Sequence, residues 1–209
     1  MRVGETKCGL RLRGRGLRLS ASAVVAASLA GCALTQRAEA PRETYDISAP
    51  DTVSGTGRTR AQILVKAPTA LKAIDSDRIV VRPSANVITY LSGAQWQDAV
   101  PRLFQVKLLE TFQNTGSTGA TALPGDGLVI DYQLVIEVRR FGIDTQGAPR
   151  AVLETSIKLL TDRSGQVRES RIFTATAPAG APPEGYVQAI DAAFDEMARD
   201  IVRWVIAST

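Results

Sequence analysis

The sequence predicts an α+β domain, with a mostly antiparallel sheet of about six strands and two amphipathic helices packed on one of its faces. Apolar and polar residues alternate over 128–141, and two further strand-like segments follow after short turns. Two other segments, 99–114 and the stretch from Pro183 onward, place their apolar residues at helical spacing. Strands and helices that are kept apart in this way are typical of an α+β sandwich, with the second sheet face left for solvent or a partner.

The chain begins with the parts of a secretory signal. Four arginines within 11–18 precede an uncharged apolar run over 19–29. The run ends in Leu-Ala-Gly-Cys at 29–32, which resembles the lipobox of bacterial lipoproteins. In that family the signal is removed before the cysteine, whose thiol receives a diacylglycerol. The resemblance implies a signal peptide over 1–31 and lipidation at Cys32.

The domain would be held to the membrane by a short tether. Residues 32–43 are mostly polar and contain Pro41, and the folded domain is expected over 44–209. The residue after the cysteine is Ala33 and not aspartate. By resemblance to enterobacterial lipoprotein sorting, this favours the outer membrane, with the domain on the periplasmic side.

The amino-terminal segment allows two other interpretations. The apolar run has 11 residues, whereas a spanning helix needs about 20, so a transmembrane anchor is disfavoured. Cys32 is alternatively an ordinary thiol, if cleavage occurs elsewhere, for instance near 38–40. That would leave an unpaired cysteine in an oxidising compartment, which is uncommon. Lipidation explains the single cysteine better.

Removal of residues 1–31 changes the charge and the cysteine content. This segment holds six of the 25 basic residues and one of the 21 acidic residues, so the mature chain has a net charge of −1. That balance gives no argument for nucleic acid as a partner. Cys8 leaves with the signal and the chain contains no histidine. We therefore expect no disulfide in the mature chain, and no metal or other cofactor.

The first half of the domain contains short strand-like segments that proline and glycine separate. They are 44–48, 62–67, 78–82 and 86–91. The last two flank Pro83-Ser84-Ala85 and predict a hairpin, whereas 69–76 favours a short turn of helix.

The first predicted helix, 99–114, has an apolar residue at every fourth position, as in Phe104, Leu108 and Phe112. Asp98 is a candidate N-cap, and Gly116 suits the end of the helix.

A glycine-rich loop over 117–127 follows this helix. Strands over 128–141, 151–159 and 167–175 then predict a three-stranded meander. The last helix carries an apolar stripe that is long enough to cross the sheet.

The chain lacks the residues of the common hydrolytic sites. Without histidine it cannot form a Ser-His-Asp or a Cys-His arrangement. The polar face of the last predicted helix holds charged residues, namely Asp195, Glu196, Arg199 and Asp200, and pairing at i,i+4 spacing explains them. We therefore expect that the protein is not an enzyme. A lipid hydrolase is the enzymatic alternative, but no spacing nominates its serine or carboxylate.

The stretch 78–116 carries a resemblance to a known family. It contains an arginine-led strand at Arg78, a hairpin with Tyr90, then Trp96, and a helix that starts with the sequence PRLFQVKLLE. In these features it resembles the ABC-type transport auxiliary lipoproteins, the PqiC-like family. The similarity extends over most of 44–207.

The resemblance implies a role in transport without catalysis. Members of the family lie on the outer membrane in the periplasm and partner an Mce-domain protein with an associated ABC permease and ATPase. These systems move lipids or other hydrophobic molecules between the membranes, and the auxiliary lipoproteins can form homo-oligomeric rings. The alternative from another class is a structural or assembly lipoprotein of outer-membrane biogenesis that has no transporter partner.

Two aromatic residues, Tyr90 and Trp96, are candidate partner-binding residues. Trp96 precedes the helix 99–114, and a hydrophobic residue at such a position commonly packs the start of a helix against its surroundings. Packing in the core is therefore the favoured role of Trp96, and contact with a partner is the alternative. With Cys32 as the lipidation site, these residues complete the candidate set, which contains no catalytic and no metal-binding residue.

Overall fold

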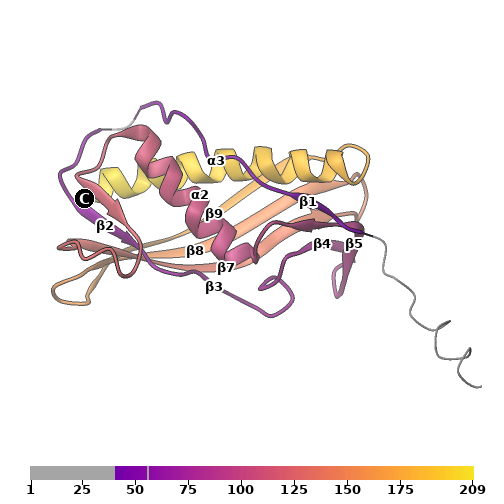
Figure 1. Cartoon of the computed structure of the whole chain (residues 1–209), viewed down its shortest axis with the longest axis horizontal. Coiled ribbons are helices and arrows are strands. Elements are labelled where there is room, and N and C mark those ends of the chain that lie inside the picture. Colours follow the sequence, from indigo (N-terminus) through magenta and orange to yellow (C-terminus); the bar gives the residue numbers. More distant parts are fainter. Residues whose placement is uncertain (1–40, 56) are drawn as a thin grey trace, which may run out of the picture. The chain divides into compact units, whose positions relative to one another are not determined.

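The structure, a computed structural model, describes residues 41–55 and 57–209. The predicted signal peptide and Cys32 lie outside the described residues. In Figure 1 both helices lie on the same side of a single sheet. The order of the elements is β1 (Glu43–Tyr45), β2 (Gln62–Val65), β3 (Thr69–Ala70), β4 (Arg78–Ser84), β5 (Val87–Trp96), α2 (Val100–Thr115), β6 (Ala120–Ala122), β7 (Tyr132–Asp144), β8 (Arg150–Thr161), β9 (Val167–Pro178) and α3 (Glu184–Ser208).

The long strand β7 joins the two halves of the sheet. Along one edge it pairs antiparallel with β8, which pairs antiparallel with β9. Along its other edge, β7 pairs in parallel with β2 at its start, β3 near its middle and β4 at its end. Beyond β2 lies β6, and beyond β4 lie β5 and then β1. The other eight described strands therefore join β7, directly or through one or two neighbouring strands.

The α+β class is confirmed, but the sheet is larger than the predicted six strands and is mixed. Five of the eight strand pairings are parallel, although the longest pairings, β7–β8 and β8–β9, are antiparallel, so the expectation of a mostly antiparallel sheet is correct only in part. Side chains alternate between the two faces in both kinds of pairing, and periodicity therefore does not reveal strand direction. The additional strands β3 and β6 have two and three residues, where a turn of helix and a loop were expected. Strands this short form because a neighbouring strand pairs with them, and the residue pattern of the segment itself does not predict them.

The β4–β5 hairpin and the meander of β7, β8 and β9 are confirmed. The start of the meander differs, because the strand begins at Tyr132 and not at Leu128. Leu128 and Val129 precede it with exposed side chains. Their apolar character continues the alternation in the sequence, but these residues have no strand partner in the described part of the chain.

Both predicted helices are present at nearly the predicted positions. Pro101 lies in the first turn of α2, and Gly116 ends the helix in the left-handed conformation with φ 56°. The proposed N-cap is wrong: Ala99 holds that position, and the carboxylate of Asp98 accepts a hydrogen bond from the backbone N–H of Ala99 at 2.7 Å.

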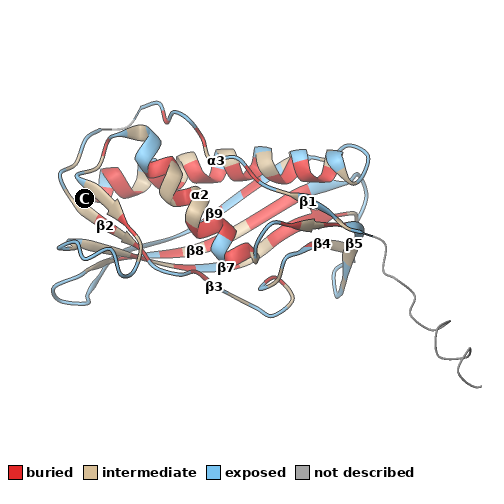
Figure 2. Cartoon of the chain, in the orientation of Figure 1, coloured by how far each residue is buried: buried red, intermediate tan, exposed pale blue. Residues whose placement is uncertain are grey.

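The core lies between the helices and the sheet. Figure 2 shows buried residues along the side of α3 that faces the strands. Phe104 of α2 and Phe194 of α3 meet edge to face, with their ring centroids 5.4 Å apart. Every second residue of β8 contributes to this core, namely Ala151, Leu153, Thr155, Ile157 and Leu159. Neither helix of the described region is long and apolar enough to cross a membrane.

Candidate functional site

The predicted lipidation site cannot be placed, because Cys32 lies outside the described residues. The described unit begins at Pro41, two residues before β1. Strand β1 pairs with residues 94–96 of β5, so the tether would join the domain beside the β4–β5 hairpin. Lipidation of Cys32 therefore stays a prediction, but the place where a tether would meet the domain is defined.

Trp96 is a core residue. Its side chain is 1 % exposed, and its ring meets Phe141 of β7 edge to face at a centroid distance of 5.8 Å. The indole Nε1 has no hydrogen-bond partner in the described structure, which a buried N–H group rarely lacks. A ring covered to this degree offers no surface to a partner protein. Trp96 therefore has a packing role, and of the two candidate aromatics only Tyr90 reaches the surface.

Tyr90 is half-buried on the face of the sheet that the helices leave open. It pairs with Val80 of β4, and its hydroxyl donates to the carbonyl oxygen of Ala73 at 3.4 Å. The guanidinium carbon of Arg78 lies 4.1 Å from the centroid of its ring, in a cation–π contact. Tyr90 and Trp96 do not form one site. The pairing of the hairpin shifts register between them, where Gly93 has a φ of 72°.

A β-bulge in β7 places two consecutive arginines on this open face. Val138 and Phe141 both pair with core residues of β8, and the register shift lies between Val138 and Arg140. Arg139 and Arg140 both fit between these core positions on the same side of the strand, whereas regular alternation would direct one of them into the core. Sequence reasoning missed this pair, because nothing in the alternation marks the extra residue.

Neighbouring strands add three more arginines to this region. Arg82 of β4 pairs with Asp144 of β7, which pairs in turn with Arg150 of β8, so the three side chains form a row across the sheet. Arg78 at the start of β4 joins them through its contact with the ring of Tyr90. We name the following five residues the arginine face: Arg78, Arg82, Arg139, Arg140 and Arg150.

Three carboxylates partly neutralise the arginine face. Arg139 contacts Glu137 at 3.0 Å and Glu154 at 3.7 Å, and Arg140 contacts Asp144 at 3.3 Å. Within the described residues, the other three arginines form no ion pair, so the face keeps a net positive charge.

The carboxylate of Asp144 forms an ion pair with Arg140, and Asp144 lies between Arg82 and Arg150 in the row across the sheet. Its carboxylate accepts a hydrogen bond from the backbone N–H of Gln146 at 2.9 Å, and this bond together with Arg140 holds the pKa of Asp144 below its ordinary value. The side chain is almost fully buried between its neighbours. Asp144 therefore stays ionised at neutral pH and orients Arg140 on the surface.

No cluster of three or more metal-ligating side chains occurs among residues 41–55 and 57–209. These residues define a small α+β domain with a basic sheet face. The chain belongs to the family of ABC-type transport auxiliary lipoprotein components, whose model matches residues 45–202.

Individual relatives agree with this assignment. An uncharacterised protein of Bradyrhizobium diazoefficiens is 30 % identical over 171 residues, which make up 81 % of this chain. The match takes in 46 % of that protein, so the chain spans about half the length of the curated relative that it matches.

Two crystal structures share the fold. A protein of Xanthomonas campestris, assigned to the DUF330 family, is 28 % identical with a TM-score of 0.73, over 79 % of this chain and 96 % of that one. An uncharacterised protein with 12 % identity has a TM-score of 0.63, over 79 % of this chain and 99 % of that one, and shows the fold alone.

Proposed function

We propose that this protein is the auxiliary lipoprotein of an Mce-type ABC transport system, which moves lipids or other hydrophobic molecules between the two membranes of the cell envelope. The observation that carries the proposal is the family match over 45–202, which runs from the end of β1 into α3. The lipobox-like sequence before Cys32 supports it independently, because that sequence lies outside the matched region.

In this proposal the domain is anchored in the outer membrane through lipid on Cys32 and lies on the periplasmic side. Each buried acyl CH₂ group contributes about 0.8 kcal/mol, so several chains make the attachment effectively permanent. Eight residues lie between Cys32 and Pro41. At about 3.3 Å per extended residue, they let the domain reach roughly 30 Å from its anchor.

The role of the domain is to bind and position, without catalysis. Its partners are an Mce-domain protein and the associated permease and ATPase, and it assembles with further copies of itself as a ring. Tyr90 is the partner-contact residue that the chain offers at its surface, since it is half-buried and stacked on Arg78.

Affinity capture from cells tests this function. The full chain would be expressed with a carboxyl-terminal tag, cross-linked in intact cells, extracted from the membranes with detergent and identified together with its partners by mass spectrometry. We expect an Mce-domain protein and ABC components to be recovered with the wild type. The matched control is Cys32→Ser, which should leave the outer-membrane fraction and lose these partners.

Two outcomes would contradict the proposal. Recovery of outer-membrane assembly factors alone would favour a structural or assembly lipoprotein. Unchanged fractionation of Cys32→Ser would show that Cys32 does not carry the anchor.

A further inference from the structure

We propose that the arginine face is a membrane-docking surface, which lies against the anionic phospholipid headgroups of the membrane that holds the anchor. This inference rests on the proposed lipid anchor, and it adds an orientation: the sheet faces the membrane and the helices face away. Tyr90, which stacks on Arg78, then lies beside the headgroups, and its proposed contact with a protein partner is replaced by contact with the membrane. The first support is the charge on the face, where five arginines outnumber Glu137, Asp144 and Glu154.

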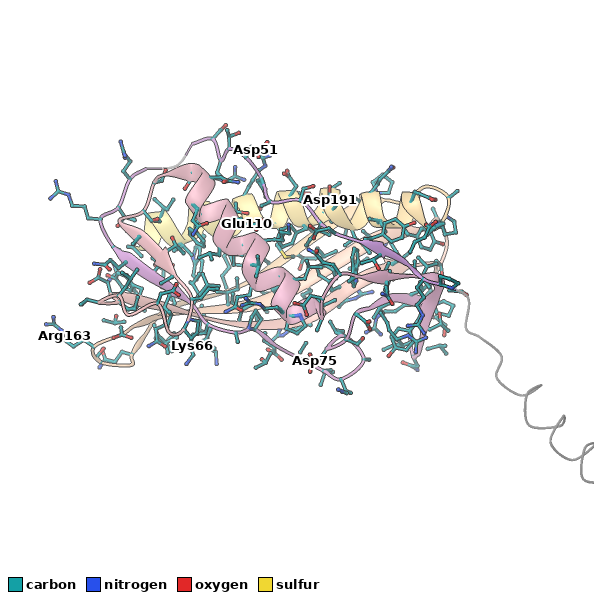
Figure 3. The ribbon with its side chains drawn as sticks, viewed as in Figure 1. Asp51, Lys66, Asp75, Glu110, Arg163 and Asp191 are labelled. Carbon is teal, nitrogen blue, oxygen red and sulfur yellow. The ribbon has the colours of Figure 1, made fainter. Side chains whose placement is uncertain are left out.

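On the opposite side of the domain, helix α3 has the opposite charge. Helix α3 carries five carboxylates and two arginines, and both arginines form ion pairs within the helix, Arg199 with Asp195 and Arg203 with Asp200. Figure 3 shows Asp51, Glu110 and Asp191 on this helix side of the domain. An anionic surface would therefore attract the sheet side and repel the helix side, although the mature chain as a whole is nearly neutral.

The chemistry of the arginine face suits phosphate groups. Arg78, Arg82 and Arg150 form no ion pair among the described residues, and a guanidinium group presents its donors in a planar fork that matches phosphate oxygens. Arg82 and Arg140 border a small hollow with the buried residues Val80 and Val152.

The position of the face agrees with a tethered domain. Arg78 and Arg82 lie on β4, which is separated from β1 by β5 alone. The chain towards Cys32 leaves the described domain next to β1. A tether that starts there is attached close to the arginine face, so the anchored domain can lie with this face on the headgroups without stretching its tether.

Vesicle flotation tests the docking surface without the lipid anchor. The mature chain with Cys32→Ser would be mixed with vesicles of phosphatidylcholine alone, or with a third of the lipid replaced by phosphatidylglycerol. We expect at least about 25-fold stronger binding to the anionic vesicles at low salt, because several arginines each contribute roughly fivefold. Equal binding to both vesicle types would overturn the proposal.

Paired variants separate the arginine face from overall charge. Arg82→Gln with Arg150→Gln should lower binding to anionic vesicles about 25-fold. Arg102→Gln with Arg163→Gln changes the net charge equally at positions outside the arginine face and should bind within about twofold of wild type. Equal losses in both pairs would contradict docking through the arginine face.

A gain of binding gives a readout that unfolding cannot mimic. Glu137→Gln with Glu154→Gln removes the acidic contacts of Arg139 and should strengthen binding. No gain in this variant would count against the proposal. Sodium chloride and sodium phosphate at one ionic strength should weaken binding equally through screening, whereas displacement by phosphate alone would indicate a site for the free anion and would overturn docking on a membrane.

The two proposals fail in different ways. If capture from cells recovers the transporter but vesicle binding ignores lipid charge, the docking surface is wrong and the proposed function stands. If vesicle binding follows the arginine face but capture recovers no transporter, the proposed function is wrong.

Discussion

Gly142 of β7 lies so close to Val80 of β4 that a Cβ atom at position 142 would be 2.3 Å from the carbonyl oxygen of Val80 and 2.9 Å from its Cβ. These two residues are partners in the parallel pairing that connects β7 to the β4–β5 hairpin. The approach is closer than any side chain allows, so only glycine permits the hairpin to join the sheet at this point. The hairpin carries Arg78, Arg82 and Tyr90, and their placement therefore depends on Gly142.

Replacing Gly142 with alanine should lower the free energy of unfolding by about 1–3 kcal/mol, because backbone must move to admit the methyl group. Urea unfolding followed by circular dichroism measures the change. The control is Gly57→Ala, where the nearest atom to the added Cβ, Cγ2 of Ile206, is 4.0 Å away. Equal stability of the two variants would show that β4 and β7 are not in close contact at Gly142.

The two tryptophans should respond differently to substitution. Trp96→Ala should cost about 3–5 kcal/mol, because it leaves a cavity in the core. Trp96→Phe should cost less than about 2 kcal/mol, because it also removes a buried N–H that lacks a partner.

Trp204 is the matched control for Trp96, since it is only partly buried and its Nε1 donates to Glu169 at 2.9 Å. Trp204→Ala should therefore destabilise the protein less than Trp96→Ala in the same urea experiment. The reverse order would contradict the assignment of Trp96 to the core.

The stability provided by Asp144 should depend on pH. Its pKa is lowered from the ordinary value of 3.8, chiefly by the hydrogen bond from Gln146 and also by Arg140. The unfolded chain then binds the proton more tightly, so this contribution is complete above about pH 4 and is lost as the pH falls through the lower pKa of the folded state. In urea unfolding, the deficit of Asp144→Asn against wild type should shrink below about pH 4. A deficit that stays constant down to about pH 2 would contradict this role.

Gln105 should anchor α2 to the sheet. Its side chain is 3 % exposed, and Nε2 donates to the carbonyl oxygen of Val65 in β2 at 2.9 Å. Gln105→Leu keeps a similar volume but leaves that carbonyl without its side-chain donor, so unfolding should become easier by about 1–3 kcal/mol. Gln113→Leu, at an exposed position of the same helix, should change stability by less than about 0.5 kcal/mol. If both variants have the same free energy of unfolding, the hydrogen bond to Val65 does not stabilise the fold.

The helices and strands that carry a continuous stripe of buried apolar residues could be predicted from the sequence. In α2, Phe104, Leu108 and Phe112 follow one another at helical spacing, and all three lie in the core. The alternation in β7 and β8 likewise matched the face that the helices cover. In these cases one local pattern decides both the type of the element and its buried side.

The rest of the sheet depends on contacts that no local pattern records. Strand β3 consists of Thr69 and Ala70 and exists through its pairing with residues 137–138 of β7. The same limit applies to the arginine face, because the bulge beside Arg139 and Arg140 reverses the alternation at one residue. The burial of Trp96 confirms that it packs in the core, which was the favoured role. Lipidation of Cys32 stays a prediction, because Cys32 lies outside the described residues.

The central claim, that this domain serves an ABC transporter, is tested most directly by photo-cross-linking in living cells. A photoreactive amino acid would replace Ile172 on β9, Val129 before β7 or Glu196 on α3, all of which are exposed. We predict that at least one position gives an adduct with an Mce-domain protein or another component of the transporter, and the reactive position would identify the docking side. Adducts with outer-membrane assembly factors alone, or with no protein at any position, would contradict the claim.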